Sequence, residues 1–125
     1  MNDSYLYRAK CCNKNEYVTG YLYITHAGKY EISCYNENLN TERFTYTVIP
    51  ESVGRCTGMR DMHGDLIFQN QIIKAFKHDE TPYTNSVTFH DGCFWFGSWN
   101  WIEFLSIFRN IEIVGDKAEN MLSKE

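Results

Sequence analysis

Two carboxylates and an imidazole alternate within one short polar segment. Asp61, His63 and Asp65 stand two residues apart, with Gly64 among them. Carboxylate and imidazole groups at this spacing can bind a divalent metal ion, whereas a glycine in the same segment is typical of a hairpin turn. We favour the turn, because no further ligand motif accompanies these residues. The charged run at residues 78–80 is likewise interpreted as a solvated loop.

The cysteines and glycines show no catalytic or cofactor-binding signature. The five cysteines contain no C-x-x-C pair, and neither they nor the serines lie in a nucleophile motif such as G-x-S-x-G. Gly54 and Gly58 lack the following Lys and Ser or Thr of a phosphate-binding loop. We therefore expect a non-enzymatic protein with no metal or cofactor, and reduced thiols at Cys11, Cys12, Cys34, Cys56 and Cys93.

The most unusual feature is the aromatic run FWFGSWNW at residues 94–101. Exposed rings of this kind can stack on nucleobases or anchor a protein partner. A strand followed by a helix would instead bury most of them in a core, which we favour because Phe94 and Phe96 share one strand face. If a face stays uncovered, the candidate partner-binding residues are Trp95, Trp99, Arg55 and Arg60.

Composition narrows the class of protein. The net charge of −4 and the pI near 5.5 argue against a general binder of nucleic acid or membrane surfaces, because such proteins need an excess of Lys and Arg. The 16% of aromatic residues favours pleated sheet. No stretch approaches the roughly 20 apolar residues that span a bilayer, and the N-terminus shows no signal-peptide pattern. We expect a cytoplasmic protein.

Apolar and polar residues alternate along most of the chain, which predicts strands. At residues 17–25 the alternation puts apolar or amphipathic side chains on both sides, so we expect both faces to be partly covered. Asp91-Gly92 is the strongest turn signal, since this pair favours a type I′ hairpin. Residues 36–42 are expected to form a loop, and Pro82 is expected to interrupt the pattern. The expected strands are residues 5–9, 17–25, 30–35, 44–49, 53–57, 66–68, 72–76, 86–90, 93–96 and 111–114.

One segment follows helical rather than strand spacing. Trp101, Phe104, Leu105 and Phe108 stand at i, i+3, i+4 and i+7 behind Asn100, a residue that favours helix caps. We predict one short helix near residues 100–108. The fold expected is mainly β, a twisted antiparallel sheet or barrel-like domain built from hairpins. It should form a single domain over residues 1–115, followed by a polar tail at residues 116–125.

A resemblance to a known family rests on residues 48–76, VIPESVGRCTGMRDMHGDLIFQNQIIKAF. They resemble the central signature of the YopX-like family, in which an apolar-Pro-Glu-(Thr/Ser)-Val-Gly segment precedes a Thr-Gly-Leu-x-Asp-x-Asn-Gly hairpin. Residues 6–9 and 112–120 are similar to the opening and closing segments of that family. The resemblance implies a mostly β fold encoded in phages and prophages, with no established activity and no functional residues to carry over.

The chain departs from the family pattern at two places. His63 replaces the hairpin asparagine, a change we expect the turn to accept because His is also enriched at positive φ. Gln69-Asn70-Gln71 replaces a Glu-Gly-Asp segment, which removes both carboxylates and the glycine. Any role of that turn in the family is therefore in question in this chain.

These observations leave three functional hypotheses. The leading one is a phage- or prophage-encoded accessory protein of the bacterial host cytoplasm, which binds a host or phage protein or assembles with its own copies. The alternative is a nucleic-acid-binding module that uses a local face of aromatic and basic residues, against which the acidic composition counts. The second alternative is a small hydrolase or nuclease with a site assembled from scattered histidines and carboxylates.

Overall fold

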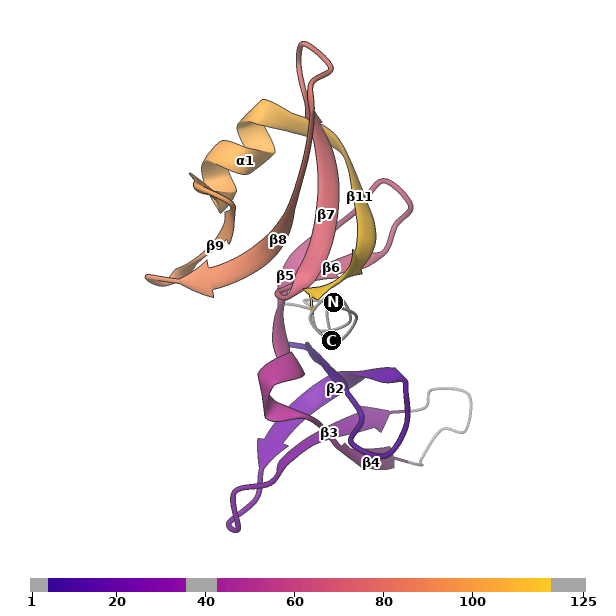
Figure 1. The fold of residues 1–125 in the computed structure, drawn as a ribbon. Helices are drawn as coiled ribbons and strands as arrows, with labels where there is room; N and C mark the ends of the chain where they lie inside the picture. The colour runs from indigo at the N-terminus through magenta and orange to yellow at the C-terminus, as the bar shows by residue number, and fades with distance from the viewer. Residues whose placement is uncertain (1–4, 36–42, 118–125) are drawn as a thin grey trace, which may run out of the picture. The chain divides into compact units, whose positions relative to one another are not determined.

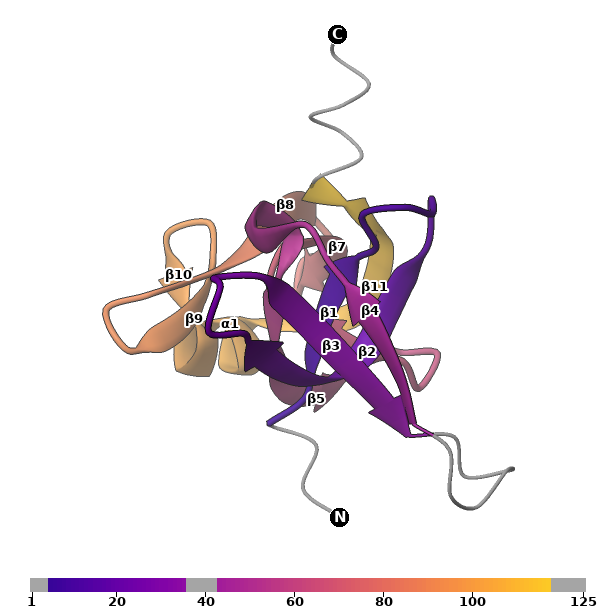
Figure 2. The same ribbon diagram turned by 90° about the horizontal axis from the view of Figure 1, so that it is seen from below.

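The computed structural model describes residues 5–35 and 43–117, which form two compact units. Unit 1 comprises residues 1–56 and unit 2 comprises residues 57–125. Each unit consists mostly of antiparallel strands, and the described residues contain one short α-helix and no closed barrel (Figure 1, Figure 2). The prediction of a mainly β fold is confirmed. The predicted single domain stays a prediction, and the loop at residues 36–42 and the tail at 118–125 lie outside the described residues.

Unit 1 is a curled antiparallel sheet with strand order β4-β3-β2-β1-β5. An isolated bridge joins Cys11 to Val48, and the Cys12 N–H donates to the Thr47 carbonyl at 2.9 Å, so the ends of β1 and β4 meet. The elements are β1 (Tyr7–Lys10), β2 (Tyr17–Ile24), β3 (Tyr30–Tyr35), β4 (Arg43–Thr47), the 3-10 helix η2 (Pro50–Ser52) and the first residues of β5 (Gly54–Arg60).

The inner face of this sheet holds a small core. Ala9, Ile32 and Val48 are fully buried, with partly buried side chains packed around them. Glycine is required at Gly20, because a Cβ there would lie 2.3 Å from the Ser33 carbonyl oxygen. Unit 1 thus depends on close approach between strands rather than on large buried side chains.

Unit 2 contains a sheet with strand order β10-β9-β8-β7-β11 and the hairpin formed by the end of β5 with β6. Asp91 and Gly92 have φ values of 54° and 79°, both positive as a type I′ turn requires, which confirms the predicted hairpin. The elements are β6 (Leu66–Phe68), β7 (Gln71–Lys77), β8 (Pro82–His90), β9 (Cys93–Phe96), β10 (Trp99–Asn100), α1 (Trp101–Ile107) and β11 (Phe108–Asp116).

In unit 2, strands β8 and β11 differ most from the predicted boundaries. β8 begins at Pro82, where an interruption was expected; proline is accepted there because the first residue of a strand can lack a ladder donor. β11 starts at Phe108 and continues to Asp116, beyond both predicted ends. The two-residue strand β10 was not predicted.

Helix α1 begins with a capping box. The Asn100 side chain accepts the Glu103 N–H at 2.9 Å, and the Glu103 carboxylate accepts the Asn100 N–H at 3.2 Å. Trp101 and Phe104 are buried, whereas Leu105, which belongs to the same apolar spacing, is 37% exposed. Leu105 lies about 100° around the helix from Phe104, and a helix of two turns buries only a narrow stripe.

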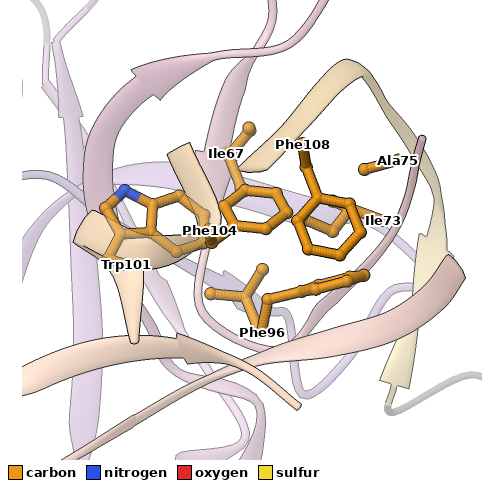
Figure 3. Close-up of a cluster of buried hydrophobic side chains, with 8 residues drawn as sticks. Ile67, Ile73, Ala75, Phe96, Trp101, Phe104 and Phe108 are labelled. Atoms are coloured by element: carbon orange, nitrogen blue, oxygen red, sulfur yellow. The ribbon is translucent and has the colours of Figure 1, made fainter. Parts of the chain in front are cut away.

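The core of unit 2 is aromatic (Figure 3). The Phe96 ring centroid lies 4.7 Å from that of Phe104 and 5.3 Å from that of Phe108, and Trp101 stacks on Phe104 at 4.8 Å. Ile67 from β6 and Ile73 from β7 are buried in the same cluster. The core interpretation of the aromatic run is therefore confirmed for Phe96 and Trp101.

Candidate functional site

The four residues predicted to bind a partner were the first candidates. Trp95 lies on β9, where its indole N–H donates to the His90 carbonyl at 3.0 Å. Its ring stacks on the His90 imidazole, with centroids 4.7 Å apart and an interplanar angle of 5°. One face of Trp95 is therefore covered by a neighbouring side chain of the same hairpin.

Trp99 packs at the rim of the unit 2 core. Its ring makes edge contacts with Tyr83 at 5.5 Å and with Phe108 at 5.0 Å. The Lys77 ammonium lies 5.2 Å from the Trp99 ring centroid and 5.0 Å from that of Tyr83, so a cation covers both rings.

The two arginines belong to different units. Arg55 lies in unit 1, with its guanidinium 5.6 Å from the Tyr7 ring. Arg60 lies in unit 2 on the β5–β6 hairpin and donates to the Gly64 carbonyl at 2.7 Å. Each of the four candidates is thus engaged by side chains or carbonyls of its own unit.

The outer face of unit 1 carries a set of exposed hydroxyl-bearing side chains that the sequence analysis did not single out. In the sheet register Tyr21 stands opposite Ser33, and Ser33 opposite Thr45, so the three side chains share one face. This face is opposite to the one that bears Ile32. We call it the tyrosine face, defined by Thr19, Tyr21, Tyr23, Thr45 and Thr47 in the strands and by Tyr5, which stacks on Tyr21.

The three rings of the tyrosine face are partly exposed to solvent. Tyr5 and Tyr21 are each 42% exposed and Tyr23 is 54% exposed. Tyr5 stacks on Tyr21 with centroids 5.5 Å apart and an interplanar angle of 7°. Both faces of β2 were expected to be partly covered; Tyr17 is half-buried and Tyr21 is partly covered by Tyr5, whereas Tyr23 is mostly exposed. The signal in the sequence was the tyrosine alternation itself, but alternation does not tell which face is covered.

Asp61 shows that the segment at residues 61–65 is a structured turn. Its buried carboxylate accepts the N–H groups of His63 at 2.9 Å, Asp65 at 3.0 Å and Ile113 at 3.2 Å. Burial opposes ionisation, but these three hydrogen bonds outweigh it and hold the pKa of Asp61 below its ordinary value. The turn interpretation is confirmed, although Asp61 is buried rather than solvated. The positive φ belongs to Gly64, at 87°, and not to His63.

The turn between β6 and β7 keeps its geometry despite the departure from the family pattern. Asn70 has a φ of 77°, a conformation that asparagine tolerates better than most residues. The Gln71 side-chain oxygen accepts the Phe68 N–H at 2.8 Å in a buried position. Asparagine and an amide oxygen can therefore fill the places of the family glycine and carboxylate.

A family model described as YopX protein matches residues 6–120. The chain belongs to the YopX family. The match covers nearly all described residues of both units, which confirms the family predicted from the motif at residues 48–76. No curated protein and no solved structure matches this YopX family member significantly. In the described parts of the chain, no helix has the length and apolar character needed to cross a membrane.

Proposed function

We propose that this YopX family member is a phage- or prophage-encoded, non-catalytic domain that binds a protein partner through the tyrosine face of unit 1. The observation that carries the proposal is the exposure of Tyr5, Tyr21 and Tyr23 on one side of a paired sheet. Tyr21 and Tyr23 lie on β2 and Tyr5 stacks on Tyr21, in a unit whose own core lies on the opposite face of the sheet.

The chemistry of this face suits a protein surface. Tyrosine supplies a large, rigid contact area with a polar tip at low cost in side-chain entropy, and for this reason it dominates antibody paratopes. Thr45 and Thr47 stand on β4, separated from β2 by β3, and add exposed hydroxyl groups that can hydrogen-bond to a partner.

The charges favour a protein over a nucleic acid. Six basic and six acidic residues fall in unit 1, so the net charge of −4 comes entirely from unit 2. Glu31 stands opposite Tyr23 on the tyrosine face. Nucleic-acid binding requires an excess of basic groups to neutralise phosphates, which this balance does not provide.

The test uses a photo-crosslinking amino acid at position 23, expressed in cells that carry the phage or prophage. We expect crosslinks to one or a few proteins, and none from the same amino acid at position 102, because Ile102 is exposed but belongs to unit 2. With the identified partner, Tyr21→Ala/Tyr23→Ala should weaken binding by about tenfold or more. Equal crosslinking from both positions, or unchanged affinity of the double variant, would contradict the proposal.

Two further measurements test the other molecules that could bind the tyrosine face: a second copy of the chain and a single-stranded nucleic acid. Crosslinks only between copies of the chain, together with a dimer in light scattering, would identify self-assembly as the form of binding. Salt-sensitive binding to single-stranded DNA or RNA that is lost in the same double variant would instead favour the nucleic-acid hypothesis.

A further inference from the structure

Within the part of the chain that the structure describes, strand β11 lies at the edge of the unit 2 sheet, where β7 is its strand neighbour. The other side of an edge strand presents N–H and C=O groups that can pair with a strand of another molecule, and natural proteins usually block such edges. Irregularities in its register with β7, after Arg109 and after Ile113, already make β11 less regular.

The turn between β5 and β6 covers the free edge of β11 (Figure 1). The Met62 N–H donates to the Ile111 carbonyl at 2.8 Å, and the Ile113 N–H donates to the Asp61 carboxylate at 3.2 Å. The turn therefore supplies one donor and one acceptor to backbone groups two residues apart, as a neighbouring strand would.

A third contact joins the same two segments through side chains. His63 Nε2 lies 3.0 Å from Glu112 Oε2. This hydrogen bond, together with the surrounding negative charges, raises the pKa of the His63 imidazole above its ordinary value. The charged residues around the contact are Arg60, Asp61 and Asp65 in the hairpin, Glu112 on β11, and Lys74, which stands opposite Glu112 on β7.

We propose that the β5–β6 turn is a clasp that closes the free edge of β11 against pairing with another strand, and that protonation of His63 tightens this clasp. The inference does not rest on the proposed function, because all its residues lie in unit 2. It assigns a role to the central family motif, whose aspartate is Asp61.

The two titrating groups define a pH window. The stabilisation from His63 is complete below the ordinary imidazole pKa of roughly 6.5 and is lost as the pH rises through the raised value. The stabilisation from Asp61 is present above the ordinary carboxyl pKa of roughly 3.9 and is lost as the pH falls through the lowered value. The clasp should therefore be tightest at mildly acidic pH.

The first test is amide hydrogen exchange at Ile113, corrected for intrinsic rates. In Asp61→Asn an amide N–H group replaces a carboxylate oxygen, so we expect exchange about tenfold faster or more, and concentration-dependent association in sedimentation. Asp65→Asn is the matched control, because it removes a carboxylate from the same turn without removing the acceptor of Ile113. Unchanged protection in Asp61→Asn, or opening of the edge without association, would overturn the proposal.

The second test isolates the imidazole. In the wild type, protection of Ile113 should fall by about twofold to fivefold between pH 6 and pH 9, the range for an exposed ion pair. His63→Gln can still hydrogen-bond to Glu112 but does not titrate, so this decrease should disappear. Because His63 is exposed, its replacement should not prevent folding. His63→Gln therefore tests whether protonation of His63 tightens the clasp, even if Asp61→Asn fails to fold. The same decrease in both proteins would refute the role of His63.

Discussion

The two units place their aromatic residues in opposite ways. Unit 2 buries Phe96, Phe104 and Phe108 in one cluster. Among the described residues, the fully buried cluster of unit 1 contains no aromatic residue; some of its tyrosines are partly buried against that cluster, and Tyr5, Tyr21 and Tyr23 are exposed. The composition is divided in the same way: eight of nine tyrosines lie in unit 1, while seven of eight phenylalanines and all three tryptophans lie in unit 2. Rings without a hydroxyl group gain the most free energy from burial, whereas tyrosine can also lie at the surface with its hydroxyl group in water. Unit 2 therefore places its largest rings in a core, whereas unit 1 leaves part of its tyrosines exposed.

The largest effect should come from the unit 2 core. Phe104→Ala should lower the free energy of unfolding by about 3–5 kcal/mol, the usual cost of truncating a buried phenylalanine. All three tryptophans lie in unit 2, so tryptophan fluorescence during urea unfolding reports on this unit. A loss below about 1 kcal/mol, as seen for surface substitutions, would contradict the view that the aromatic cluster stabilises unit 2.

A smaller effect is expected where unit 1 depends on strand proximity. Gly20→Ala should cost about 1–3 kcal/mol, because its Cβ would meet the backbone of Ser33. Faster hydrogen exchange of β2 and β3 amides would measure this loss, with Thr19→Ala on the exposed face as the control. Equal exchange rates in the two variants would show that the close approach of Gly20 to Ser33 does not limit the stability of unit 1.

Acidification should distinguish the units further. As the pH falls through the lowered pKa of Asp61, its carboxylate is protonated and the stabilisation from its three backbone hydrogen bonds is lost. Tryptophan fluorescence should therefore report a decline in unit 2 stability at acidic pH, and this decline should be reduced in Asp61→Asn. An identical acid profile in both proteins would mean that other carboxylates control the decline.

The smallest change in stability should follow substitution on the tyrosine face. Tyr23→Ser should alter the free energy of unfolding by less than about 0.5 kcal/mol, as is usual for exposed positions, while it weakens partner binding. Chemical denaturation followed by circular dichroism would measure the first quantity. A loss comparable to that of Phe104→Ala would show that the tyrosines stabilise unit 1.

Local signals predicted much of the fold. Asp91-Gly92 specified its turn because positive φ at two successive residues favours few residue types, and Asn100 with Glu103 specified the start of α1 because a capping box is satisfied within four residues. The motif at residues 48–76 identified the family for the same reason, since its turn residues lie next to one another in the chain. The partner-binding role of Trp95 and Trp99 stays a prediction; their contacts with His90 and Phe108 come from strand pairing and core packing, which alternation does not specify.

The sequence by itself determined the strand alternation, the turns and the helix start. Only the tertiary structure decided which side of β2 faces solvent, that Leu105 lies outside the core, and that Asp61 binds the N–H of Ile113, 52 residues away. The physical reason is the distance along the chain over which each interaction acts. Turn and cap geometry depends on hydrogen bonds within a few residues, whereas burial depends on which distant strand or helix packs above a face.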